Sequence, residues 1–198
     1  MKRFVRRGRT VSSRLSSYEV SLLSSLCNQL TEMLVETIVD ADPGRAAAVA
    51  SDDPFDLWAR DLAVDPEDPE LPDDPAVQRL FPNAYPHDAA ASSDFRRFTL
   101  RDQRDNKLAA VRVVLGDLAA TQHGGHPVKI SDDHTEAWLK TLTNLRLSVA
   151  TRLGITDSEA AEELAQLADD DPRAFMHSIY EWLGFAQETL LTAIADRL

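Results

Sequence analysis

The chain has 198 residues and a mass of 22.0 kDa; 43% of its residues are hydrophobic and 27% are charged, which suits one soluble globular domain with an apolar core. Its 21 Lys and Arg residues against 33 Asp and Glu residues give a net charge of −12, so the body as a whole disfavours non-specific binding to nucleic-acid phosphate. The single cysteine excludes an intramolecular disulfide and a cysteine-rich zinc site. No apolar run is long enough to cross a membrane, and Phe4-Val5 is too short for the apolar region of a signal peptide, so we expect a cytoplasmic protein.

The first predicted element is a basic β-hairpin in residues 1–16. Two β-prone stretches, residues 3–5 and 11–15, flank Gly8, which suits a tight turn. Six cations and no acid occur in residues 1–14: Lys2, Arg3, Arg6, Arg7, Arg9 and Arg14. Residues 128–130 alternate in the same way and are left open as a third strand. Because an isolated hairpin is marginally stable in water, we expect this one to pack on helices.

An apolar stripe at helical spacing predicts a helix over residues 17–39. The next segment, residues 40–75, contains twelve acids, two arginines and six of the ten prolines. Proline lacks an N–H group and restricts the residue before it, so this segment is predicted to be an extended acidic linker. Within it, residues 52–58 resemble a short capped helix whose Phe55 and Trp58 would pack on the body.

The remaining periodicity is helical. Helices are predicted over residues 74–81, 90–121, 132–154, 157–168 and 172–198. Gly154 suits the C-terminal cap of the third of these. The side chains expected to face the core include Phe95, Phe98 and Leu108 in the long helix and Phe175, Ile179 and Trp182 in the last one. We therefore expect a mainly α, single-domain helical bundle in which residues 76–198 form the main body, packed against helix 17–39 and the small β-hairpin.

Three histidines form the cluster most suggestive of chemistry. His123, His126 and His134, with Asp132 or Asp133, offer ligand types that suit zinc or iron, and the intervening glycines would let the loop wrap a metal. Their spacing matches no metal signature, and the alternative is a polar turn between two helices. A Gly-x-Ser-x-Gly elbow, a phosphate loop and a nucleophile–His–acid set are all absent, so we expect no enzyme and no cofactor.

Two further polar features interrupt apolar stripes. Asp102 and Asp105 lie on the apolar face of helix 90–121, so either the helix leaves the core there or these carboxylates pair with a cation such as Arg146. Cys27 shares a helix face with leucines, which favours a buried, weakly reactive thiol. The alternative is a redox-sensing thiol that forms a mixed or intersubunit disulfide.

The basic end of the chain is the clearest functional feature. Its arginines can bind phosphate or an acidic protein surface: Arg3, Arg6, Arg7, Arg9 and Arg14. The alternative is that they bind the chain's own acidic linker or are simply solvated. Both interpretations remain open at this point.

Five stretches taken together resemble a known family. They are residues 74–85 (DPAVQRLFPNAY), 94–99 (DFRRFT), 137–147 (AWLKTLTNLRL), 152–155 (RLGI) and 180–183 (YEWL). In order and content they resemble the actinobacterial AosR-like proteins, first described as a domain of unknown function, over nearly the whole chain apart from the linker. The resemblance implies a transcriptional regulator that responds to oxidation and associates with a stress sigma factor or RNA polymerase. Because Cys27 has no partner in the chain, disulfide switching within one chain is excluded, which leaves an intermolecular bond or no thiol sensing.

The expected function is therefore a non-enzymatic cytoplasmic regulator of the oxidative-stress response. We expect its basic hairpin to meet an acidic face of a stress sigma factor or RNA polymerase, with promoter DNA left open as a further partner. No membrane partner is expected, and a homodimer is left open. Two alternatives come from other classes: a metal-dependent hydrolase that uses the three histidines, and a structural adaptor or dimer.

Overall fold

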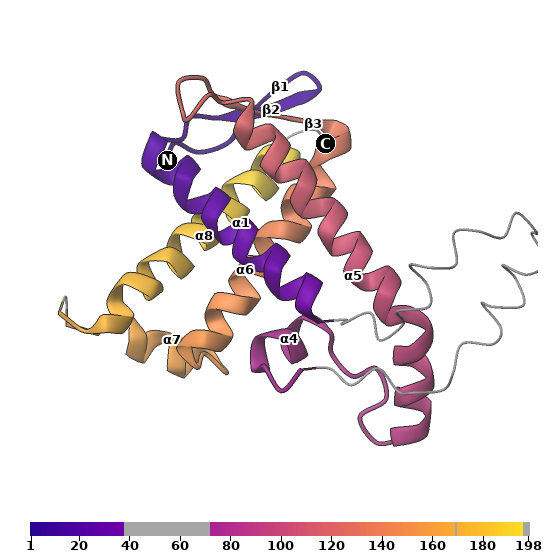
Figure 1. The fold of residues 1–198 in the computed structure, drawn as a ribbon. Helices are drawn as coiled ribbons and strands as arrows, with labels where there is room; N and C mark the ends of the chain where they lie inside the picture. Colours follow the sequence, from indigo (N-terminus) through magenta and orange to yellow (C-terminus); the bar gives the residue numbers. More distant parts are fainter. Residues whose placement is uncertain (38–71, 169, 196–198) are drawn as a thin grey trace, which may run out of the picture.

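The computed structural model describes residues 1–37, 72–168 and 170–195, and it confirms a mainly helical fold with a small antiparallel sheet (Figure 1). The elements in chain order are β1 (Val5–Arg7), β2 (Thr10–Ser13), α1 (Ser17–Glu36), α4 (Pro75–Leu80), α5 (Ala89–Ala119), β3 (Val128–Ser131), the 3-10 turn η2 (Asp132–His134), α6 (Thr135–Leu153), α7 (Ser158–Leu164) and α8 (Pro172–Ala195). The helices predicted within the described residues are present. The proposed packing of Phe55 and Trp58 lies outside the described residues.

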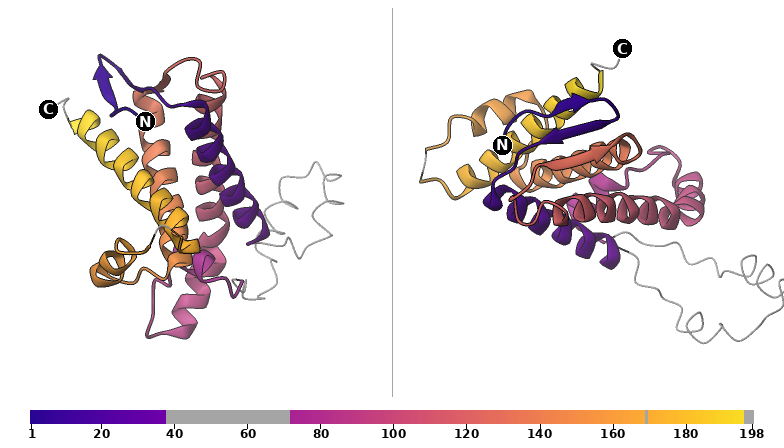
Figure 2. Two further views of the ribbon diagram at one scale, coloured as in Figure 1. Left: turned by 90° about the vertical axis from the view of Figure 1, so that its left-hand side faces the viewer. Right: turned by 90° about the horizontal axis from the view of Figure 1, so that it is seen from above.

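Helix α6 is the central element of the bundle. It contacts α1, α4, α5 and α8, so segments far apart in the sequence meet along it. The sheet lies at one end of the helices and α4 lies toward the other (Figures 1 and 2). The largest fully buried side chains come from several elements: Trp138, Leu23, Leu34, Leu118, Ile130, Leu142, Leu183 and Leu190. Among the described residues, no helix is long and apolar enough to cross a membrane.

The three strands form one antiparallel sheet in the order β1-β2-β3. The proposed third strand is thus present and pairs with β2, where Val11 lies opposite Ile130 and Ser13 lies opposite Val128. These inward-facing residues are buried, and Phe4 meets Trp138 of α6 edge to face with ring centroids 6.1 Å apart. The sheet therefore leans on the helices, as a small hairpin must.

Local capping chemistry determines where several helices begin and end. Ser16 caps α1 in a capping box with Glu19: the Ser16 side chain accepts from the Glu19 backbone, and the Glu19 side chain accepts from the Ser16 backbone. Helix α6 ends at Gly154, which has a φ of 75° in the left-handed region that favours glycine. The prediction for Gly154 is confirmed.

Two aromatic side chains predicted to face the core are exposed instead. Phe98 is 72% exposed and Phe175 is 61% exposed. Phe98 lies in the first half of α5, where few residues are buried because the helix extends past its neighbours. Phe175 shares the apolar side of α8 but lies one turn before Ile179, the first buried residue of that helix. Both side chains lie on the apolar side of their helices, but they stay largely exposed to solvent, and the Phe98 ring is contacted by the guanidinium of Arg97, 4.8 Å from its centroid.

Two carboxylates on α5 are exposed for the same reason as Phe98. Asp102 and Asp105 are both exposed, and Asp105 pairs with the adjacent Arg104 at 3.0 Å. Arg146 instead contacts Gln187 and Tyr180 of α8. Of the two alternatives for this stretch, the structure shows the one in which α5 leaves the core.

Candidate functional site

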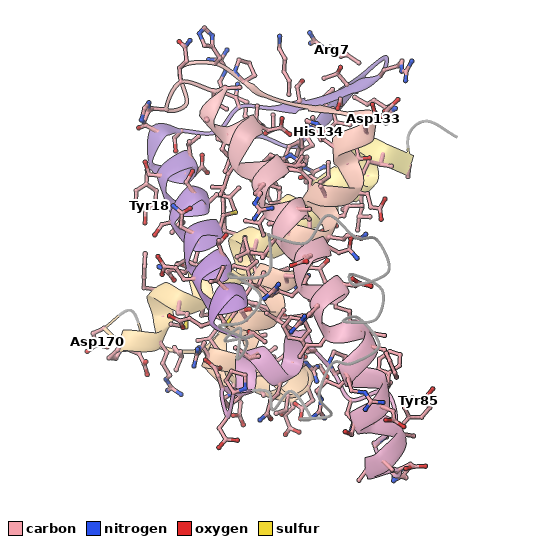
Figure 3. All side chains as sticks on the ribbon, turned by 45° about the vertical axis from the view of Figure 1, so that its right-hand side comes forward. Arg7, Tyr18, Tyr85, Asp133, His134 and Asp170 are labelled. Atoms are coloured by element: carbon pink, nitrogen blue, oxygen red, sulfur yellow. The ribbon has the colours of Figure 1, made fainter. Side chains whose placement is uncertain are left out.

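The outer face of the three-stranded sheet is open to solvent. Side chains alternate along a strand, so the neighbours of the buried Val11 and Ile130 point outward. The register places Val5, Ser12 and Lys129 in one row and Arg7, Thr10 and Ser131 in the next. Val5, on the edge strand β1, is 53% exposed on this face. Arg7 extends from the sheet away from the helices (Figure 3).

The alternation continues beyond the strand ends and adds more cations. The backbone N–H of Lys2 donates to the carbonyl of Arg14 at 3.2 Å, so the two strands stay adjacent there. Arg3 and Arg14 are exposed and fall on the same side as Val5 and Ser12 by the two-residue period. We define the outer sheet face as four exposed cations: Arg3, Arg7, Arg14 and Lys129. They gather positive charge at one end of a chain whose net charge is −12.

Arg6 does not belong to this face. Its side chain is only 10% exposed, forms an ion pair with Asp132, and donates from Nε to the Gly8 carbonyl at 3.0 Å. Arg9 is exposed in the turn, with Nε 3.6 Å from the other Asp132 oxygen. The predicted contact of Arg6 with a partner stays a prediction, but its guanidinium already binds a carboxylate of the same chain in the structure.

The structure does not bring the three candidate histidines together. His126 contacts Gln122 at 3.2 Å, whereas the Nδ1 atom of His134 lies 3.0 Å from the Asp117 carboxylate. His123 is exposed in the turn before β3. Within the part of the chain that the structure describes, no group of three His, Cys, Asp or Glu side chains is placed to hold a metal ion.

The glycines beside these histidines have a packing role. Gly124 has a φ of 84°, and a Cβ atom at this position would lie 2.8 Å from the backbone nitrogen of Ser17. His123 itself has a φ of 57°, so the chain turns sharply here. The loop thus makes a close backbone approach to the start of α1, which explains Gly124 without a metal.

Asp117 organises a polar cluster that the sequence analysis missed. Its carboxylate accepts a hydrogen bond from Trp138 Nε1 at 2.8 Å and contacts His134 Nδ1 at 3.0 Å. The Asp117 side chain is 13% exposed, so these contacts satisfy a carboxylate that is mostly removed from water. The sequence signal that could have indicated this cluster is an aspartate within the apolar run of α5, next to Leu118.

Glu19 organises a second cluster beneath the sheet. It accepts from the N-terminal ammonium of Met1, from Ser16, and from Trp182 Nε1 at 3.3 Å. Burial acts to raise the pKa of Glu19, but the N-terminal ammonium and the Ser16 donors outweigh it, so the pKa is lowered. Glu19 thus joins α1, the chain start and α8.

Cys27 lies in the core. The structure buries it on α1, and burial raises the pKa of its thiol to about 12. Because the thiolate is the reactive form, the folded protein presents very little nucleophilic sulfur near neutral pH. This fits the interpretation of Cys27 as a small apolar core residue.

The structure is thus a helical bundle with a small sheet whose outer face carries four exposed cations. A family model described as "Domain of unknown function (DUF2017)" matches residues 1–194, and the chain belongs to this family. Comparison with curated proteins and with solved structures gave no match.

Proposed function

We propose that this protein is a non-enzymatic regulator that binds a partner protein through its outer sheet face. The observation that supports this proposal is the placement of four exposed cations on one side of a small sheet, with the apolar Val5 between Arg3 and Arg7. An acidic partner surface would be attracted to this face and repelled by the acidic remainder of the chain. Such complementarity orients a complex and accelerates its formation.

The resemblance to AosR-like proteins supplies the proposed partner. We propose a stress sigma factor, or the RNA polymerase that carries it, and a role in the oxidative-stress response in the cytoplasm. Cys27 is the only cysteine and is buried with a raised pKa. We therefore propose that this chain responds to oxidation through its contact with the partner and not through oxidation of its own thiol.

The test uses the full chain with three charge reversals on the outer sheet face, Arg3→Glu, Arg7→Glu and Lys129→Glu. Binding to labelled stress sigma factors is measured by fluorescence anisotropy under reducing and oxidising conditions and at several salt concentrations. We expect the reversals to weaken binding about tenfold or more at low salt and to reduce its salt dependence.

The matched control carries the same charge change on exposed residues of α4 and α5, namely Arg79→Glu, Arg101→Glu and Arg112→Glu. This control should bind nearly as well as the unmodified chain. Equal losses in both variants would contradict the assignment of the sheet face, and an absence of binding under either redox condition would contradict the proposed partner.

The same variants distinguish promoter DNA from a protein partner. Because the chain carries a net charge of −12, DNA binding would be confined to the sheet face and would weaken steeply with salt. The unmodified chain and the charge-reversal variant are therefore also titrated with duplex DNA. If DNA binds as tightly as the sigma factor, and the variant loses DNA binding to the same extent, promoter DNA replaces the protein as the proposed partner.

A further inference from the structure

The seam between α6 and α8 holds the guanidinium group of Arg146, whose contacts with the described residues are with neutral side chains. Arg146 Nη1 donates to the Gln187 side-chain oxygen at 2.9 Å, and Nη2 donates to the Tyr180 hydroxyl at 3.3 Å. The guanidinium also lies over the Tyr180 ring, 5.0 Å from its centroid. Gln187 is held in place because its amide nitrogen donates to Thr143 at 2.7 Å. These contacts fix the cation between the two helices.

Among the residues that the structure describes, no carboxylate balances the charge of Arg146. In the described part of the chain no acid forms an ion pair with it, and its buried Nε atom has no hydrogen-bond partner. Partly buried charges in proteins are normally paired, since desolvation without compensation is costly. A cation held by neutral groups is therefore a site that an anion would stabilise.

Unused donors remain at this position. Each terminal nitrogen of Arg146 has a second N–H, and the Tyr180 hydroxyl, which accepts from Arg146, still has its own hydrogen to donate. The His177 ring lies on the same side of α8, with its centroid 6.4 Å from that of Tyr180. At Gly184 a Cβ atom would lie 3.5 Å from the guanidinium carbon, so the backbone of α8 passes within van der Waals reach of this group.

We propose that Arg146 and Tyr180 form an oxyanion-binding site on the α6–α8 seam. The ligand would carry a carboxylate or a phosphate group, the two groups whose oxygens match the donors of a guanidinium. All four flanking residues, His177, Tyr180, Gly184 and Gln187, are half-buried, so the seam is reached from solvent. This site lies on different elements from the outer sheet face and does not depend on the function proposed above.

The test is an NMR titration of the full chain with inorganic phosphate and, separately, with acetate, at constant pH and ionic strength. Saturable shifts of backbone amides in residues 143–146 and 180–187 are expected. Saturation by phosphate alone identifies a phosphate-bearing ligand, saturation by acetate alone identifies a carboxylate, and saturation by neither overturns the proposal.

Two variants make the assignment specific. Tyr180→Phe keeps the ring but removes the hydroxyl, and should weaken binding about fivefold, as the loss of one neutral hydrogen bond implies. Arg146→Gln should abolish saturation. The control Arg112→Gln removes an exposed cation on α5 and should leave the titration unchanged. Saturation that persists in Arg146→Gln would overturn the site.

Loss of saturation in Arg146→Gln could also result from poor folding of the variant. A measurement of thermal stability with a second variant separates the two causes. Arg146→Met removes the guanidinium and its charge but keeps an unbranched apolar stem. Without ligand, this variant should have a melting temperature equal to or above that of the unmodified chain, because it removes an unpaired charge. The saturating anion should raise the melting temperature of the unmodified chain but not that of Arg146→Met. A large loss of stability in Arg146→Met, with equal stabilisation of both proteins by the anion, would contradict the proposal.

Discussion

Helix α5 has two halves with opposite surroundings. From Leu108 to Leu118 it lies inside the bundle, and five of its side chains there are buried: Leu108, Ala110, Val111, Val114 and Leu118. Between residues 89 and 104 only Ser92 and Leu100 are buried; Phe98 is exposed, as is Tyr85 just before the helix. One continuous helix thus anchors the fold at the sheet end and provides surface at the other, so the effect of a substitution should depend on which half it touches.

The charged side chains of the two regions also differ in how far they are removed from water. At the sheet end, Glu19 and Asp117 are mostly removed from water and each contacts several donors. In the first half of α5, Arg97 pairs with Asp94 at 3.1 Å in a largely solvated setting. Exposed pairs of this kind contribute about 0–1 kcal/mol, whereas loss of a partner from a buried group costs more. The sheet end is therefore where the removal of a polar group should matter.

The largest effect is expected for Trp138→Ala. This substitution empties a fully buried site, removes the edge-to-face contact with Phe4, and leaves the Asp117 carboxylate without its indole donor. We expect a loss of about 3–5 kcal/mol in the free energy of unfolding, measured by urea denaturation. Trp138→Phe keeps most of the volume and should lose less. A loss below about 1 kcal/mol for the alanine variant would contradict the division between the two ends.

A pair of glycine substitutions sharpens the comparison. Gly124 and Gly154 both have positive φ, but only at Gly124 would a Cβ atom meet backbone, 2.8 Å from Ser17 N. We expect Gly124→Ala to cost about 3 kcal/mol, from left-handed strain plus the clash, and Gly154→Ala about 1 kcal/mol from strain alone. Both are measured by urea unfolding. Equal costs would show that the loop moves away from α1 and does not depend on the close approach.

The next effect is expected at Glu19. Glu19→Ala removes one half of the capping box and the contact to Trp182, and should cost about 1–2 kcal/mol at neutral pH. Ser25→Ala, on the exposed side of the same helix, is the control and should change stability little.

The lowered pKa of Glu19 also gives a pH dependence. Because the folded pKa lies below the ordinary value of 4.5, the stabilising contribution is complete above that pH and is lost as the pH falls through the folded pKa. Urea midpoints measured between neutral and acidic pH should therefore fall less steeply for Glu19→Gln than for the unmodified chain. Parallel curves would show that Glu19 does not carry this dependence.

The features that the sequence predicted are local ones. The capping role of Gly154 depends on a single residue at a helix end, and the burial of Cys27 depends on its place in a stripe within one helix. The alternation of residues 128–130 also pointed to a third strand, which was left open and which the structure contains. In each case the sequence pattern that indicated the feature lies within one short stretch of the chain.

The features that it missed require contacts between distant elements. Helical spacing shows that Phe98 lies on the apolar side of its helix but not that the helix extends past its neighbours there. Likewise the pairs Arg6–Asp132 and Arg146–Tyr180 join residues far apart in sequence. A stripe defines a face, and only the tertiary arrangement defines what covers it.

The smallest effect is expected for Phe98→Ala. Phe98 is largely exposed, so its truncation should change the free energy of unfolding by no more than about 0.5 kcal/mol. Leu100→Ala, two residues further along the same helix but buried, should cost about 2–4 kcal/mol and serves as the internal comparison. Both are measured by urea unfolding at two protein concentrations. A loss for Phe98→Ala that approaches the Leu100→Ala value and grows with concentration would show that a second copy of the chain covers this half of α5 in solution, and the contrast between the two halves would then hold only for the monomer.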